Sequence, residues 1–358
     1  MVRAKESKAK GFFFGILAAV SYGANPLGAK YLYEEGLNVE SVLFYRYGLA
    51  ALIIGVIIAG KMLLGKRNAS HRASTDPAAT ETTGSYETFR ISRGELSTLT
   101  ALGLLFVVSS LTLYCSFLYM DSGVACSLLF VYPVMTAVLM AMLYGEKITK
   151  ATAVAIALSL VGVFLLYKGD GKTLLSTVGV LLVMVSALSY ALYIIVANRA
   201  SAPESELKGS HNRLARIIPL PHSVSIHRLE MSAMKLTFYV LIVCALSIVL
   251  FSLTSPERHI LPLVTGRAWA YSWMLAIVPT VLSLVSMGIS VRIIGSTPTA
   301  ILGALEPVTA IFFGIAVFGE SLTVRESFGL VMIIVAVTFV IAGGNITCLL
   351  YTSDAADE

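Results

Sequence analysis

The sequence carries little charge for its length. Only 13% of its 358 residues are Asp, Glu, Lys or Arg, whereas 57% are hydrophobic, and the mean hydropathy is +0.83. A soluble globular domain has roughly 25% charged residues, because its surface must be covered by polar groups. The composition therefore argues against a soluble domain and predicts a chain whose solvent is the lipid bilayer.

Cysteine and histidine are also scarce, and neither forms a recognisable site. The 4 cysteines include no C-x-x-C pair, so no redox or zinc motif is indicated. All 5 histidines fall in polar segments between the apolar blocks, which excludes an intramembrane metal cluster. A phosphate-binding P-loop is missing too, so an ATP-driven pump would need a separate chain. We expect no metal, no cofactor and no enzymatic activity.

What the sequence has instead is a series of apolar blocks of about twenty residues. Such a length lets a helix cross a hydrocarbon core of about 30 Å. Helices are expected rather than a β-barrel, because the blocks lack apolar–polar alternation. The sequence predicts an all-α integral membrane protein with ten transmembrane helices, over 11–32, 41–63, 96–119, 123–144, 151–168, 177–197, 231–253, 269–291, 298–318 and 325–342.

Two stretches resemble each other at one offset, which indicates an internal repeat. Four pairs of identical residues lie 174 positions apart, namely Pro133 and Pro307, Gly145 and Gly319, Glu146 and Glu320, and Thr149 and Thr323. A weaker match at 168 positions relates Gly11, Ala19, Ser21 and Tyr22 to Gly179, Ala187, Ser189 and Tyr190. We predict two repeats, 11–168 and 177–342, each of five helices. Since five is odd, the second repeat is inverted in the membrane.

The distribution of Lys and Arg predicts the orientation. Eighteen of these residues fall on the side that holds the amino terminus, against six on the other side. By the positive-inside rule both termini are cytoplasmic, including the N-terminal segment 1–10. The net charge of +5 then follows from topology, and no nucleic-acid partner is expected. The first apolar block continues past Tyr22 to Tyr33, so it is read as a retained helix rather than a signal peptide.

Three polar segments lie outside the predicted helices. Residues 65–93 and 198–229 are predicted cytoplasmic loops, with few apolar residues to fold around. Flexible linkers and sites for a partner or regulator are both open interpretations of these loops. The tail 343–358 is polar and has no counterpart in the first repeat, so it is either a disordered end or sequence foreign to the protein.

The paired motifs resemble a known family. The Pro…Gly-Glu-x-x-Thr corners, the phrase Leu305-Glu306-Pro307-Val308, and Gly329 followed by an Ile/Val-rich run are similar to the EamA repeats of the drug/metabolite transporter superfamily. The resemblance implies two inverted five-helix repeats around a central cavity. It also implies export or exchange of amino acids and other small metabolites.

Glu306 is the candidate coupling residue. It falls in the middle of the ninth block, and its counterpart at the 174-residue offset is Tyr132. A charge inside the bilayer is costly and is therefore a functional hypothesis by default. One interpretation is a carboxylate that alternately binds a proton and a substrate amine. The other is a structural residue that hydrogen-bonds backbone groups freed by Pro307.

Arg46 is the candidate for binding an acidic group. It lies about five residues into the second block. Its side chain either extends to the headgroups or makes a structural pair, which we slightly favour, or it faces the cavity and binds a substrate carboxylate.

Prolines predict where the helices break. Pro26, Pro133, Pro279 and Pro307 all fall inside apolar blocks. Broken helices give transporters polar groups within the membrane, so we place Tyr22, Asn25, Tyr190 and Tyr193 at the substrate site. Packing roles remain open for the kinks and for the tyrosines.

The function predicted is a multi-pass secondary transporter of the bacterial plasma membrane that exports or exchanges small metabolites, with amino acids or related compounds favoured. A proton or a counter-substrate would drive it, and lipid is its other partner. The alternatives are a multidrug or nucleotide-sugar carrier of the same superfamily, and, from another class, a membrane receptor or scaffold. A monomer and a homodimer fit equally.

Overall fold

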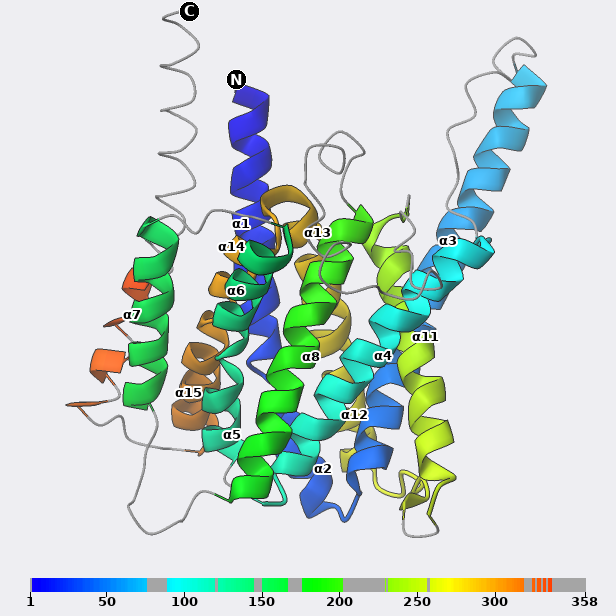
Figure 1. Ribbon diagram of the computed structural model, residues 1–358. Helices are drawn as coiled ribbons and strands as arrows, with labels where there is room; N and C mark the ends of the chain where they lie inside the picture. The colour runs from blue at the N-terminus through cyan, green and yellow to red at the C-terminus, as the bar shows by residue number, and fades with distance from the viewer. Residues whose placement is uncertain are drawn as a thin grey trace, which may run out of the picture.

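A computed structural model of the chain describes most of the predicted helical region (Figure 1). It covers residues 2–75, 89–119, 122–144, 150–166, 176–201, 229, 231–255, 258–318, 324–325, 327–329, 331–332 and 334–336. Residues 145–149 and 319–323, which hold the two Gly-Glu corners, lie outside the described residues, as do most of both polar loops and the tail.

The described residues are helical nearly throughout. The elements in chain order are α1 (Val2–Tyr22), α2 (Asn25–Glu34), α3 (Val39–Thr75), α4 (Arg93–Ser116), α5 (Ser122–Leu129), α6 (Tyr132–Tyr144), α7 (Lys150–Leu166), α8 (Thr177–Ser201), α11 (Ala233–Ser252), α12 (Gly266–Ala276), the π-helical turn η3 (Ile277–Leu282), α13 (Ser283–Ile294), α14 (Ser296–Leu302) and α15 (Leu305–Phe318).

Six helical segments in the described part are long and apolar enough to cross a bilayer. They are Lys8–Glu34, Val39–Leu64, Arg93–Ser116, Thr177–Ala200, Ala233–Ser252 and Gly266–Ile294. Shorter apolar helices follow at Tyr132–Leu143, Ala153–Gly162 and Ser327–Ala336. The structure thus has the all-helical membrane architecture that the composition predicts. That ten such helices cross the membrane in two inverted repeats stays a prediction.

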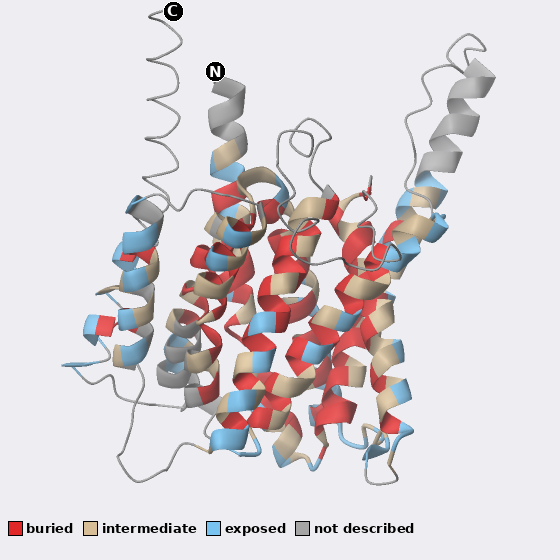
Figure 2. Cartoon of the chain, viewed as in Figure 1, coloured by how far each residue is buried: buried red, intermediate tan, exposed pale blue. Residues whose placement is uncertain are grey.

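The outward faces of these helices are apolar. Val56, Leu181, Leu246 and Leu250 are among many large hydrophobic side chains that are exposed, and Figure 2 shows exposed residues along the outer faces of the helices. Polar residues such as Ser186 are buried between helices instead. This arrangement suits lipid, which solvates apolar side chains and cannot satisfy polar ones.

Several predicted blocks are interrupted in the structure. The first is divided at Gly23 and Ala24 between α1 and α2, and Pro26 lies in the first turn of α2. Breaks at 130–131 and 303–304 likewise place Pro133 in the first turn of α6 and Pro307 in that of α15. A first turn tolerates proline because its N–H groups have no intrahelical acceptor. Pro279 differs, since it lies in η3, where the helix continues as a wider turn.

One boundary differs from the prediction. The second block was expected to end at residue 63, but α3 continues as helix to Thr75 and so enters the predicted loop 65–93. The segment projects beyond the helical body at the top of Figure 1. The residues from 65 to 75 are polar and contain no proline, so nothing in them stops a helix that is already nucleated.

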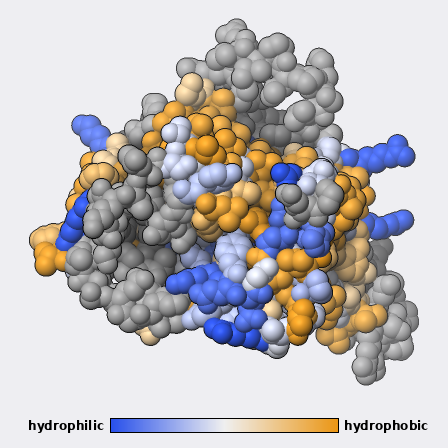
Figure 3. Space-filling view, turned by 90° about the horizontal axis from the view of Figure 1, so that it is seen from below, coloured by the Kyte–Doolittle hydropathy of each residue, from blue (hydrophilic) through white to orange (hydrophobic). Residues whose placement is uncertain are grey.

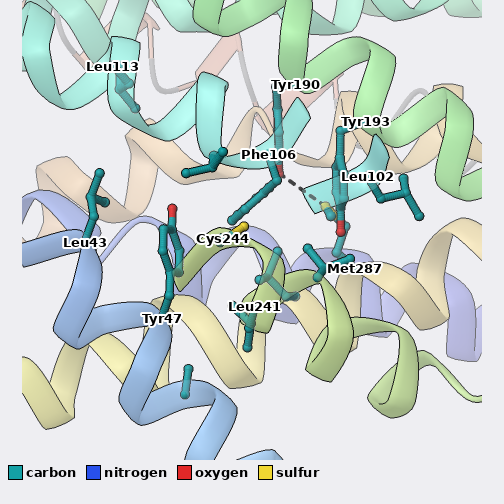
Figure 4. Packing of buried hydrophobic residues seen from close by; sticks show 14 of the residues in the cluster. Leu43, Tyr47, Leu102, Phe106, Leu113, Tyr190, Tyr193, Leu241, Cys244 and Met287 are labelled. Atoms are coloured by element: carbon teal, nitrogen blue, oxygen red, sulfur yellow. Dashed lines mark hydrogen bonds between the residues drawn. The ribbon is translucent and has the colours of Figure 1, made fainter. Parts of the chain in front are cut away.

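The two halves of the chain pack together closely. α1 packs on α13, α4 on α8, and α3 on α11. Where they meet, Tyr47, Phe106, Tyr190, Tyr193 and Cys244 form a continuous core (Figure 4). This core positions the site.

Candidate functional site

A pocket lies between the two halves of the chain. Its lining comes from α1 and α6 in the first half and from α8, α13, α14 and the α14–α15 region in the second, namely Gly15, Ala18, Ala19, Tyr132, Tyr190, Ile194, Ser283, Met287, Thr299, Gly303 and Glu306. Its cavity volume is about 10 Å³, which is about the space that one water molecule requires. A metabolite therefore fits only after the helices move.

Glu306 is the one acidic residue among these lining residues. Its side chain is 8% exposed, and no side chain or backbone group in the described part of the chain donates a hydrogen bond to its carboxylate. The carbonyl of Gly303, which Pro307 leaves without its usual donor, accepts instead from the backbone N–H of Glu306 at 2.8 Å. The geometry does not support a structural role for the carboxylate in capping this kink.

The break in the first span packs directly on Glu306. A β-carbon added to Gly23 would lie 2.6 Å from the carbonyl oxygen of Glu306 and 2.6 Å from Cβ of Thr309. Only glycine permits so close an approach. The interrupted region of α1 and the start of α15 therefore meet backbone to backbone beside the pocket.

Three tyrosines form an aromatic group around the pocket. The rings of Tyr22 and Tyr190 stack with centroids 6.5 Å apart, and Tyr132 meets Tyr190 edge-on at 4.8 Å. The Tyr190 hydroxyl donates to the sulfur of Met287 at 3.2 Å, as Figure 4 shows. Aromatic pairs at these separations attract one another, so the three rings pack together as one wall on this side of the pocket.

Tyr132 also fixes the contact between the halves. A β-carbon added to Gly303 would lie only 1.7 Å from the Tyr132 hydroxyl oxygen. The phenol of the first half thus occupies the space that any larger residue at 303 would need.

Arg46 forms a second polar cluster. Its guanidinium is fully buried; Nε donates to Thr280 Oγ1 at 2.7 Å and Nη1 to the Tyr114 hydroxyl at 3.1 Å. Its carbon Cζ lies 5.5 Å from the ring centroids of Tyr22 and Tyr47, within the range of cation–π attraction. Arg46 therefore does not reach the headgroups, and snorkelling is wrong for this residue.

The partners of Arg46 are neutral. Tyr114 passes its own hydroxyl hydrogen to Asn25 Oδ1 at 2.7 Å. Within the described residues no carboxylate lies within ion-pair distance of the guanidinium. A buried charge without a counter-ion is costly, and here neutral hydroxyl groups and tyrosine rings surround the guanidinium instead.

Pro279 explains why two groups of η3, the Thr280 hydroxyl and the Pro279 carbonyl, accept hydrogen bonds from Arg46. Because proline has no N–H, the carbonyl of Leu275 loses its usual donor. The hydroxyl of Thr280 replaces that donor, with Oγ1 2.7 Å from the Leu275 oxygen, and its lone pairs remain available to Arg46. The Pro279 carbonyl accepts a longer contact from Arg46 Nη2 at 3.5 Å.

Tyr22 connects the two clusters. Its ring centroid lies 5.5 Å from Cζ of Arg46 and 6.5 Å from the ring centroid of Tyr190. The pocket and the buried guanidinium are therefore neighbours, because Tyr22 lies next to Arg46 and next to a residue of the pocket lining.

Comparison with known proteins gives the family. The model of the EamA-like transporter family matches residues 9–168 and 223–342. The chain belongs to the EamA-like transporter family. The resemblance seen in the repeat motifs is thereby confirmed, and the chain is a multi-pass membrane protein of a family of transporters.

Relatives of this EamA-like protein are also named as transporters. An uncharacterized transporter of Synechocystis is 28% identical over 245 residues, which is 67% of this chain and 64% of that protein. One from Archaeoglobus fulgidus is 25% identical over 221 residues, 61% of this chain and 66% of that protein. The chain thus spans just under two thirds of the length of these curated relatives. A solved crystal structure with 13% identity superposes with a TM-score of 0.61, covering 92% of this chain and 96% of its own, and shows the same fold.

The structure places the predicted residues unequally. Glu306 and Tyr190 line the pocket, Tyr22 adjoins it, and Asn25 joins the Arg46 cluster through Tyr114. Tyr193 is 2% exposed, packs on Phe106 at 5.1 Å, and is not one of the residues that line the pocket.

Sequence reasoning did not select some site residues. Tyr114, Thr299 and Met287 carry no signal in the sequence that separates them from other helix residues. Tyr132 did carry such a signal in the sequence, because it is the counterpart of Glu306 at the 174-residue offset. The described part of the chain contains no group of three or more His, Cys, Asp or Glu residues that could hold a metal ion.

Proposed function

We propose that this EamA-like protein is a secondary active transporter that exports or exchanges small metabolites by alternating access, with Glu306 in the coupling and substrate site. The observation that carries the proposal is an unpaired, buried carboxylate in a pocket to which both halves contribute. Transporter sites formed at the interface of two repeats have this placement. A cavity of about 10 Å³ means that the conformation described is closed around the site.

The packing supports two inverted repeats. In an inverted repeat, each helix of the first half has a counterpart in the second: α1 and α8, α3 and α11, α4 and α12–α13, and α6 and α15. Exchanging the halves then converts the α1–α13 contact into the α8–α4 contact. It likewise converts the α6–α8 contact into the α15–α1 contact. Both members of each pair are present, and α3–α11 maps onto itself. In Figure 1, α1 begins at the top and α8 at the bottom. These relations are those of a two-fold axis in the membrane plane.

The residues suggest complementary roles. Glu306 would carry a proton or bind a substrate amine, and Arg46 would bind a carboxylate. Asn25 and Tyr114 would hold Arg46 in position, while Tyr22 and Tyr190 would form the wall between the two charges. Tyr193 would support Tyr190, with ring centroids 6.2 Å apart. An acid and a guanidinium that both adjoin the aromatic wall favour a substrate with an amine and a carboxylate, as in amino acids or related compounds.

A multidrug carrier is the second candidate. One acid among Tyr132, Tyr190 and Met287 also suits an apolar cation, because methionine and aromatic surfaces accommodate varied shapes. A nucleotide-sugar carrier would need several deep cations, and Arg46 is the fully buried one among the described residues.

Replacing Arg46 with methionine is expected to abolish transport without unfolding the protein. Thr280 and Tyr114 already give their hydroxyl hydrogens to Leu275 and Asn25, so the substitution leaves no donor unpaired. Replacing buried ionic groups by apolar side chains of similar volume is often neutral or stabilising, and among the described residues Arg46 has no carboxylate partner that the substitution would leave unpaired. Thermal unfolding of purified protein and uptake into proteoliposomes would measure both effects.

Arg46→Lys is the matched control, because it keeps the charge but loses the planar fork of donors. It should retain part of the transport. If the methionine variant unfolds, Arg46 is required for folding and not for binding substrate. If that variant transports apolar cations at an undiminished rate, the multidrug alternative is favoured.

Orientation is proposed from the basic residues. Both termini are taken as cytoplasmic in a bacterial plasma membrane, so the end of the molecule at the top of Figure 1 faces inward. A cysteine at Ser255 should react with an impermeant reagent added to intact cells, and a cysteine at Ser74 should not. Labelling of Ser74→Cys from outside would reverse the orientation.

The function itself is tested by comparing metabolites released from cells with and without the chain, and with the Glu306→Gln variant. Compounds released only with the unaltered chain identify the substrate class. If no compound differs between the three strains, a receptor or scaffold becomes the better interpretation.

A further inference from the structure

The end of the molecule at the bottom of Figure 1 brings together α2 from the first half and the start of α12 from the second. Seen from below, hydrophilic side chains gather at this end between apolar ones (Figure 3). The residues that join the two elements are Tyr31, Glu35, Thr265, Arg267 and Tyr271. These five residues form the α2–α12 latch.

The N-cap of α12 is completed by the other half of the chain. Thr265 Oγ1 accepts from the backbone N–H of Ala268 at 3.0 Å and donates to Glu35 Oε2 at 2.7 Å. The first turn of α12 contains no acidic residue of its own. A carboxylate at this place also interacts favourably with the helix dipole, so Glu35 supplies from α2 what α12 lacks.

The corresponding helix of the first half has a self-contained cap. In α4 the side chain of Ser92 accepts from the N–H of Glu95 at 3.2 Å, and the Glu95 carboxylate accepts from the N–H of Ser92 at 2.7 Å. This is a capping box within one helix. The α12 cap therefore depends on the relative position of the two halves, whereas the α4 cap does not.

Glu35 is held in place by the turn that follows α2. Gly36 has φ +85°, a conformation that favours glycine. The N–H of Gly36 donates to the Tyr33 carbonyl at 3.0 Å, and that of Leu37 to the Leu32 carbonyl at 3.1 Å. This pair of bonds is a Schellman motif, and it directs the Glu35 side chain without help from α12.

Aromatic stacking accompanies the cap. The rings of Tyr31 and Tyr271 stack 4.3 Å apart with an interplanar angle of 15°, and Arg267 lies over Tyr31 at 5.1 Å. Arg267 Nε is 3.9 Å from Glu35 Oε1, but its side chain is 57% exposed. So exposed an ion pair contributes little, and the stacked rings and the Thr265 bond are the principal contacts.

A second cap crosses between the halves nearby. Asn38 Oδ1 accepts from the N–H of Ser41 at 2.9 Å in the first turn of α3, and Asn38 Nδ2 donates to the His259 carbonyl at 3.0 Å. The N–H of Leu261 donates to Ser41 Oγ at 2.7 Å. At this end, the capping residues of two helix starts thus make hydrogen bonds to the opposite half.

We propose that the α2–α12 latch is the gate that closes this mouth of the transport pathway. Moving α2 away from α12 removes the Glu35 bond to Thr265 and separates the stacked tyrosines, so closure is favoured by a specific set of contacts. The inference rests on the proposed alternating access. All contacts of the closed gate come from this chain, and closure needs no ligand.

A cysteine reporter behind the latch tests the gate. Ser272 follows Tyr271 in α12, is 1% exposed, and its hydroxyl has no hydrogen-bond partner among the described residues. The substitution Ser272→Cys therefore breaks no hydrogen bond among the described residues, and a thiol is close in size to the hydroxyl that it replaces. In purified full-length protein with its other cysteines replaced, the rate of reaction with a charged thiol reagent reports opening of the latch.

We expect Glu35→Ala to raise this rate about five- to tenfold, the effect of losing one hydrogen bond between a cap and a carboxylate. Glu34→Ala is the matched control, since it removes the same charge one residue away at an exposed position and should leave the rate unchanged. Thr265→Val should act like Glu35→Ala, while Thr265→Ser, which keeps the hydroxyl, should restore the slow rate.

An unchanged rate in Glu35→Ala, or an equal rise in Glu34→Ala, would overturn the gate. The measurement needs no substrate and uses protein outside the membrane, so its outcome is separate from the substrate, the direction and the orientation. A working latch in a chain that transports nothing would refute the proposed function alone.

Discussion

Replacing Glu306 with glutamine is expected to leave the protein folded and to abolish transport driven by a pH gradient. Glutamine keeps the shape of the side chain but cannot gain or lose a charge. Among the described residues the carboxylate accepts no hydrogen bond, so the substitution breaks none. Apolar surroundings disfavour an ionised carboxylate, and alternation between protonated and ionised forms is what would couple a proton to the substrate.

The measurement compares two assays in proteoliposomes. Uptake driven by a pH gradient should disappear, while exchange of substrate between equal internal and external pools should continue. Gradient-driven uptake at the unaltered rate would remove Glu306 from the coupling mechanism.

Glu40 provides a matched control for this variant. It is 8% exposed, the same as Glu306, but it lies in the first turn of α3 and does not line the pocket. An acid there is favoured by the helix dipole. Glu40→Gln should therefore keep gradient-driven transport, and equal loss in both variants would indicate a general effect of removing a buried acid.

Parts of the fold were predictable because they depend on local chemistry. The composition required a helical membrane protein, since backbone groups in lipid must be satisfied within the helix. The run from Gly23 to Pro26 predicted an interrupted helix, and α1 ends at Tyr22 with α2 starting at Asn25. The match at the 174-residue offset pointed to Tyr132 as the counterpart of Glu306, and both residues line the pocket.

Other parts depend on which helices meet, and local patterns do not contain that information. A helix surrounded by lipid and other helices is apolar on every side, so its inward face cannot be read from hydrophobic periodicity. Arg46 looked like a residue near the headgroups, and only the approach of η3 and Tyr114 makes it fully buried. The end of α3 at Thr75 was missed because helix continuation leaves no sequence marker.

Gly303→Ala is expected to have the largest effect on the contact between the halves. The new β-carbon would lie 1.7 Å from the Tyr132 hydroxyl oxygen, 2.9 Å from the Ala300 carbonyl oxygen and 3.0 Å from Tyr132 Cζ. Tyr132 is 1% exposed and packs on Tyr190, so it has no free space to enter. Overpacking of this kind typically costs about 1–3 kcal/mol and occasionally more. We expect a lower unfolding temperature and loss of transport.

A second substitution tests this cause. Tyr132→Phe removes the oxygen at 1.7 Å but leaves the ring carbon at 3.0 Å, so the double variant should recover part of the stability lost in Gly303→Ala. Gly48→Ala is the control, because a β-carbon there meets nothing within 4 Å, and alanine favours the helix. A double-mutant cycle on thermal unfolding isolates the coupling between the two positions. If Tyr132 and residue 303 clash, Tyr132→Phe should relieve part of the stability loss that Gly303→Ala causes. If the stability changes of the two single variants simply add in the double variant, the alanine destabilises the protein by another contact.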